Sequence, residues 1–105
     1  MQITLLNKSW TVEEVTLTEI ADVVATDKRW HTGACDSNRK RILILKDLSE
    51  EVKQEVLIHE LTHAILLESS LKEYLSNDSQ EQYCEFVKFA YPIIKDVLGK
   101  MVAPR

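Results

Sequence analysis

The sequence has few of the residues that interrupt regular structure or cross-link a chain. Glycine and proline each occur only twice in 105 residues, so long uninterrupted helices are expected. Two cysteines are too few for the disulfide framework of a small secreted domain. The N-terminal residues lack the basic and apolar regions of a signal peptide. These absences predict a cytoplasmic protein with reduced thiols.

Long apolar runs and an excess of basic residues are also missing. No apolar stretch approaches the roughly 20 residues that a helix needs to cross a bilayer. The formal net charge is −4, which argues against a nucleic-acid partner, because phosphate binding needs a basic surface. We therefore expect neither a membrane nor a nucleic acid as partner. The length fits a single domain over residues 1–105.

The order of apolar and turn-forming residues predicts an α+β domain. Two short strands are expected around the polar turn at residues 7–9, followed by a short helix over 18–26. A β-hairpin is expected around the turn residues 36–38, with strands at 30–34 and 41–45. Its second strand is apolar on both faces and should be the more buried one.

Two long helices are expected after the hairpin. Ser49 can cap the first, whose apolar residues recur at helical spacing up to about Glu68. The second begins near Asn77, and we expect Pro92 to kink it and Gly99 to end it. Its apolar stripe consists of Tyr83, Phe86, Val87 and Ala90. The expected architecture is a small antiparallel sheet with helices packed on one side.

Residues 59–63 read His-Glu-Leu-Thr-His and match H-E-x-x-H, the motif of zinc peptidases. Residues i and i+4 lie on one face of a helix, with Cβ atoms about 5–6 Å apart. Both imidazoles can therefore reach one ion at zinc–nitrogen distances near 2.0–2.1 Å. Glu60 is placed to accept a proton from an attacking water that the metal activates, without being a ligand itself.

The alternative is that two histidines fall by chance on a solvent-facing helix. A shuffled sequence of this composition would contain the motif in roughly one case in a hundred. The flanking residues 56–58 and 64–67 are apolar nearly all round, which predicts a buried helix. Buried histidines and glutamates need polar partners, and a metal ion provides them. We therefore predict a Zn²⁺ site with His59 and His63 as ligands and Glu60 as the general base.

A catalytic zinc ion usually has three protein ligands and one open position. Glu81 and Glu85 are four residues apart on the next predicted helix, so one can bind the metal while the other holds a ligand imidazole. Spacing alone leaves open that both are surface charges. Cys84 lies between them and is a possible zinc ligand, although a role as a small buried packing residue is favoured.

The chain resembles the gluzincin metallopeptidases over roughly residues 30–90. The motif at 59–63, followed by Glu-Gln-Tyr-Cys-Glu-Phe-Val-Lys-Phe-Ala at 81–90, looks most like the compact phage and mobile-element proteins related to the ImmA/IrrE group. The resemblance implies a minimal zincin-like fold with Glu81 as the third metal ligand. It also implies that Glu85 contacts the first histidine of the motif from outside the ligand set.

Gluzincins often add a histidine or tyrosine that stabilises the oxyanion, and no counterpart can be placed here. Candidates are His31, Tyr74, Tyr83 and Tyr91. For His31 a surface position is favoured, and for Tyr83 and Tyr91 packing of the last helix is favoured. The path of the chain around Tyr74 cannot be read from the sequence.

The leading hypothesis is a zinc metalloendopeptidase that acts on a protein or peptide. An extended peptide can pair with the edge of the predicted hairpin. Some members of the resembled group cleave a repressor, so the resemblance implies a regulatory protein as substrate.

The alternative is a metal-binding interaction protein with little or no activity, such as a phage-type regulator or inhibitor. The small size favours this alternative and the intact Glu60 disfavours it. A purely structural zinc domain fits least, because such sites are usually rich in cysteine.

Overall fold

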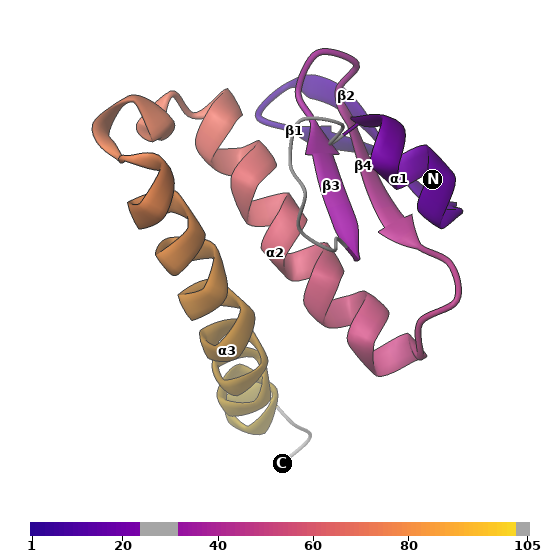
Figure 1. The fold of residues 1–105 in the computed structure, drawn as a ribbon. Coiled ribbons are helices and arrows are strands. Elements are labelled where there is room, and N and C mark those ends of the chain that lie inside the picture. Colours follow the sequence, from indigo (N-terminus) through magenta and orange to yellow (C-terminus); the bar gives the residue numbers. More distant parts are fainter. Residues whose placement is uncertain (24–31, 103–105) are drawn as a thin grey trace.

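The computed structural model of the protein describes residues 1–23 and 32–102. The elements are β1 (Gln2–Leu5), β2 (Lys8–Val15), α1 (Leu17–Val23), β3 (Gly33–Asp36), β4 (Arg41–Leu45), α2 (Glu50–Glu68), the short 3₁₀ helix η1 (Leu71–Tyr74) and α3 (Asn77–Val102) (Figure 1). The expected α+β class is confirmed. In the described part of the chain, no helix is long and apolar enough to cross a membrane.

The four strands form one sheet in the order β1-β2-β4-β3, so β1 and β3 are its edges. The outer pairs β1–β2 and β3–β4 are antiparallel, whereas the central pair β2–β4 is parallel. The sheet is therefore mixed, not antiparallel throughout as the sequence suggested. After β2 the chain passes through α1 before it forms the β3–β4 hairpin, and this crossover brings β4 beside β2 in the same direction.

Helices cover both faces of the sheet, which explains the apolar run in β4. Ile42 and Ile44 pack in a core cluster with residues of α2, whereas Leu43 and Leu45 pack in a second cluster with Ile20 of α1. Successive strand residues point to opposite faces, so a strand that is covered on both sides is apolar at every position. The layers run α3, α2, sheet and α1 (Figure 1).

Helix α2 is fixed at both of its ends. At the start, the Ser49 hydroxyl accepts a hydrogen bond from the Val52 N–H at 3.3 Å, as expected of an N-cap. At the end, Glu68 Oε2 accepts hydrogen bonds from Trp10 Nε1 at 2.8 Å and from Lys40 Nζ at 2.9 Å. Trp10 is fully buried beneath the helix. These contacts hold α2 in one position across the sheet.

The start of β3 lies directly against α2 at Gly33. A Cβ atom added there would lie 2.5 Å from Val56 Cγ1, 3.0 Å from the Leu43 carbonyl oxygen and 3.3 Å from Glu60 Cγ. No side chain fits into this space without displacing the helix or the neighbouring strand. The glycine thus lets an edge strand approach the metal-motif helix closely.

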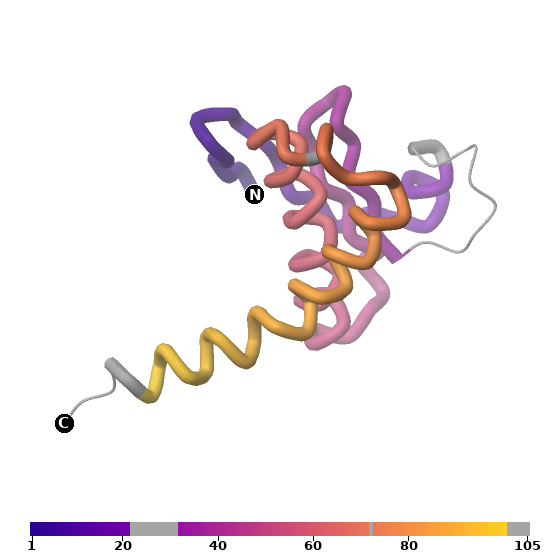
Figure 2. Tube along the Cα trace, turned by 90° about the vertical axis from the view of Figure 1, so that its left-hand side faces the viewer, coloured from indigo at the N-terminus to yellow at the C-terminus, as the bar shows by residue number. Residues whose placement is uncertain are grey.

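Helix α3 differs from the expectation in three ways. It is continuous through Pro92 and runs past Gly99 to Val102, so Gly99 does not end it. Its first half packs beside α2, but the second half leads away from the rest of the molecule (Figure 2). The predicted packing of Tyr83, Phe86 and Tyr91 is wrong, because all three side chains are exposed. Periodicity correctly indicated an apolar face but not what covers it.

Candidate metal centre

His59 and His63 lie one turn apart on α2, and both contact residues of α3. Their ring centroids are 5.1 Å apart with an interplanar angle of 62°. Both side chains are largely buried. The i, i+4 spacing on a helix fixed at both ends therefore brings the two imidazoles together, as expected.

The carboxylate of Glu81 bridges the two imidazoles. Its Oε1 lies 2.8 Å from His63 Nε2, and its Oε2 lies 3.2 Å from His59 Nε2. Ligands around one tetrahedral ion with bonds of about 2.0–2.1 Å are roughly 3.3 Å apart. The distances from Glu81 to His59 Nε2 and to His63 Nε2 are thus close to the spacing of two ligands on one shared ion.

Glu85 holds His59 from the opposite side of the ring. The His59 Nδ1–H donates to Glu85 Oε1 at 2.9 Å, and Lys88 Nζ lies 2.7 Å from Glu85 Oε2. The hydrogen bond from Lys88 holds the pKa of Glu85 below its usual value, against a smaller effect of burial, and His59 adds to the lowering. In a neutral imidazole with its proton on Nδ1, Nε2 carries the lone pair. In this structure, His59 Nε2 lies 3.2 Å from Glu81 Oε2.

The charges of the site favour a bound cation. Burial, which dominates, together with the neighbouring His59 lowers the pKa of His63, although Glu81 opposes the shift. Neutral imidazole is the form that binds a metal. Both Nε2 atoms contact the Glu81 carboxylate, and His63 is hydrogen-bonded to it, so a cation bound there would take the place of the proton between them. Two nitrogens and one oxygen are also a donor set found in catalytic zinc sites.

Glu60 follows His59 and lies at the side of the cluster. Burial of its carboxyl, with the negative charge of Glu81 adding to the effect, raises the pKa of Glu60 to about 7. A group that takes up and gives back a proton works best when its pKa is near the working pH. The environment of Glu60 therefore suits a general base at neutral pH.

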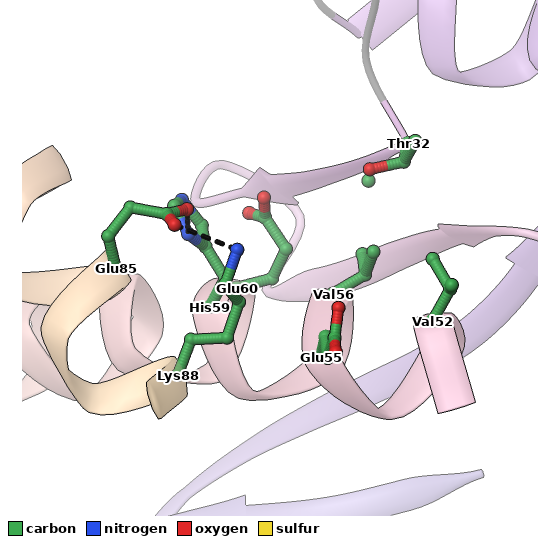
Figure 3. A pocket seen from close by; sticks show the side chains of 9 residues that line it. Thr32, Val52, Glu55, Val56, His59, Glu60, Glu85 and Lys88 are labelled. Atoms are coloured by element: carbon green, nitrogen blue, oxygen red, sulfur yellow. Dashed lines mark ion pairs between the residues drawn. The ribbon is translucent and has the colours of Figure 1, made fainter. Parts of the chain in front are cut away.

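A cavity of about 280 Å³ opens beside His59 and Glu60 (Figure 3). Thr32 and Gly33, at the start of β3, line it from one side, and Val52 and Val56 of α2 line it from the other. Figure 3 shows Glu60 between His59 and Val56, with its carboxyl directed towards the strand. A group bound in this cavity would lie next to both His59 and Glu60.

Cys84 is a second candidate for the third ligand. It is fully buried, and its Sγ lies within 4.8 Å of the ligand nitrogens of His59 and His63. Burial, followed by the charges of Glu81, Glu60 and Glu85, raises the pKa of the Cys84 thiol to about 12. A metal would have to displace that proton in a strongly negative environment. Glu81 is favoured, because its oxygens already contact both imidazoles.

The structure brings together all five residues that the sequence singled out: His59, Glu60, His63, Glu81 and Glu85. Sequence reasoning missed Lys88, although its i, i+3 spacing from Glu85 was a usable signal. It also missed Gly33, for which no local signal exists.

The candidate oxyanion donors gain no support from the structure. Tyr74 is exposed on η1, and Tyr83 and Tyr91 are exposed on α3. His31 lies outside the described residues.

No protein-family model matches the chain, and no curated protein matches it significantly in sequence. Its function therefore has to be inferred from the chemistry of the site.

Proposed function

We propose that the protein is a zinc-dependent metalloendopeptidase of the gluzincin type, in which His59, His63 and Glu81 hold the metal and Glu60 is the general base. One observation carries the proposal. The Glu81 carboxylate lies between the Nε2 atoms of both motif histidines, while Glu85 occupies Nδ1 of His59. This arrangement gathers two imidazole nitrogens and a carboxylate in mutual contact, and the contact with Glu85 orients the His59 ring.

The residues of the site divide the chemistry between them. A zinc ion held here supplies Lewis acidity towards water and the substrate carbonyl. Glu60 takes a proton from the attacking water and passes it to the leaving nitrogen, a transfer to which its pKa of about 7 is suited. Glu85 keeps His59 oriented, and Lys88 keeps Glu85 ionised and in place.

The edge position of β3 supports an extended peptide as substrate. β3 pairs with β4 along one edge, and its start lines the cavity beside Glu60. A peptide that added to the outer edge would make main-chain hydrogen bonds and bring one carbonyl towards the metal. Val52 and Val56 form an apolar wall for a side chain of that peptide. The resemblance to the ImmA/IrrE group supports a cytoplasmic phage or prophage protein with a regulatory substrate.

The second candidate is a metal-binding interaction protein that cleaves nothing, such as a phage-type regulator or inhibitor. The small size of the chain favours it, because 105 residues leave little surface for a substrate cleft. The position of Glu60 beside His59 and the cavity disfavours it, since a site that only binds metal has no use for a general base.

Metal analysis combined with a cleavage assay tests the proposal. Protein reconstituted with zinc should hold one ion per chain and cleave members of a proteome-derived peptide library. Glu60→Gln should keep the zinc and lose about 10²–10⁴-fold in rate, because only the base is removed. Glu51→Gln, an exposed change in the first turn of the same helix, is the matched control.

Each outcome separates the candidates. Protein that takes up no zinc refutes both of them. Zinc binding without cleavage of any peptide supports the interaction protein. Cleavage that Glu60→Gln leaves unchanged rules out the mechanism.

A further inference from the structure

Helix α3 carries an exposed apolar face that begins at Phe86 and continues along its second half. It consists of Phe86, Ile93, Ile94, Val97 and Leu98, whose exposed fractions are 67%, 66%, 55%, 51% and 55%. We refer to these five residues as the α3 face. Monomeric proteins rarely expose large apolar side chains in one contiguous patch, and such patches mark interaction sites.

The five side chains share one side of the helix. With 3.6 residues per turn they fall within an arc of roughly 140°. The charged residues Lys88, Lys95, Asp96 and Lys100 lie outside that arc. Asp96 and Lys100 pair with each other at 3.1 Å, so their charges are largely balanced. The face is therefore apolar and free of like charges that would repel a second copy.

The position of the helix leaves this face accessible. Figure 2 shows the C-terminal half of α3 leading away from α2 and the sheet. The radius of gyration is 14.7 Å, whereas a compact domain of this length has about 13 Å, and the longest extent of the molecule is 51 Å. The body of the domain thus leaves room for a partner along the helix.

A projecting helix of this kind needs a partner for its own stability. Isolated helices shorter than roughly 12–15 residues are marginal in water. Pro92 removes one backbone donor from this half of α3, and Gly99 lowers its helix propensity. Burial of the apolar face against another surface is the usual source of the missing stability.

We propose that the α3 face is a homodimer interface and that a second copy of this chain covers it. With roughly 200 Å² as the full surface of a large side chain, the exposed fractions amount to roughly 600 Å² per copy. Two copies would bury about 1,200 Å², the lower limit for stable, specific interfaces. A face that pairs with itself about a two-fold axis also closes after two copies. The contact does not depend on the metallopeptidase proposal.

Dimerisation would act on the metal centre through α3. Glu81 and Glu85 are on the first half of the same helix. A partner that orders the second half suppresses fraying towards these carboxylates. The dimer interface would thus help to hold Glu81 and Glu85 in place, which the monomer does less well.

Light scattering after size exclusion tests the proposal. The wild-type protein at high micromolar concentration should have twice the mass of the 12.1 kDa chain. Ile94→Glu combined with Val97→Glu should raise the dimer dissociation constant at least roughly 1,000-fold, because four apolar side chains are lost from the contact. Glutamate forms helices better than isoleucine or valine, so lost helix propensity would not explain the result.

Lys95→Glu is the matched control, since it adds the same residue outside the arc and should keep the dimer. The double variant should also keep the far-UV circular dichroism spectrum of the Lys95→Glu control, which shows that its fold is intact. A wild type that is monomeric at high micromolar concentration overturns the proposal. Larger open-ended assemblies of the wild type would also overturn the proposal, as would a double variant that remains dimeric.

Discussion

The two helices that build the site are held by very different means. Helix α2 is packed between the sheet and α3 and anchored at both ends, and its His59 and His63 side chains are 15% and 19% exposed. Helix α3 contacts α2 along its first half, and its Glu81 and Glu85 side chains are 52% and 46% exposed. The imidazoles are therefore positioned by the fold, whereas the carboxylates are positioned largely by their contacts with the imidazoles.

This difference shows what a metal would add. The imidazoles on α2 need little further ordering, so a bound ion would act mainly by fixing α3 on α2. A metal that binds only the native state adds its binding free energy to the free energy of unfolding. Its effect should therefore appear as increased stability of the protein.

Removal of zinc should have the largest effect. The free energy of unfolding should fall by about 4 kcal/mol, relative to protein in free zinc roughly 1,000-fold above the dissociation constant. Hydrogen exchange should rise more in the first half of α3 than in α2, because the sheet still holds α2. Denaturant titration with and without chelator measures the first quantity. An equal rise of hydrogen exchange in α2 and α3 would contradict the claim that the sheet holds α2 without the metal.

Alanine substitutions of Glu81, Glu85 and Cys84 on α3 should lower the zinc affinity by different amounts, according to the role of each residue. Glu81→Ala should weaken zinc binding by more than about 100-fold, and Glu85→Ala by about 10–100-fold, since Glu85 acts through His59. Cys84→Ala should leave the affinity nearly unchanged. Competition titrations give these values, and cobalt-substituted protein should lack the thiolate-to-cobalt charge-transfer band. If Cys84→Ala costs more than Glu81→Ala, the third ligand is the thiol.

The two glycines should respond in opposite directions to alanine. Gly33→Ala should destabilise the protein by about 1–3 kcal/mol, because its Cβ would overlap Val56 of α2 and the Leu43 carbonyl. Gly99→Ala should stabilise it by about 0.5–1 kcal/mol, because nothing lies within 4 Å and alanine favours the helix. Urea denaturation of the two variants compares them. A destabilising Gly99→Ala would mean that α3 is packed more tightly there than the structure shows.

The smallest effect concerns the anchor at the end of α2. The hydrogen bonds from Lys40 and Trp10 lower the pKa of Glu68, with burial opposing them. A carboxyl whose pKa is lower in the folded state stabilises the protein above its unfolded-state value near 4.5, and this contribution is lost as the pH falls through the folded-state pKa. Glu68→Gln should therefore flatten the loss of stability below about pH 4.5. An unchanged acid profile would show that the anchor does not titrate.

The parts of this fold that sequence could predict are those set by local geometry. The limits of α2 and the approach of His59 to His63 follow from an N-cap and from helical spacing. The parallel pairing of β2 with β4 could not be predicted in this way, because strand order depends on partners that are distant in sequence. The amphipathic pattern of α3 indicated an apolar face but not its exposure. The choice between Glu81 and Cys84 also required tertiary distances.

The candidate metal centre is built from one continuous stretch of chain. All five site residues lie within 59–85, on two helices joined by residues 69–76. The parallel strands that complete the sheet pair residues 30 positions apart, such as Val12 with Ile42. Closing the short helix–helix connection costs less chain entropy than joining those strands. Since local contacts generally form faster, we expect the ligands to meet before the sheet is complete, so that zinc can act as a template for folding.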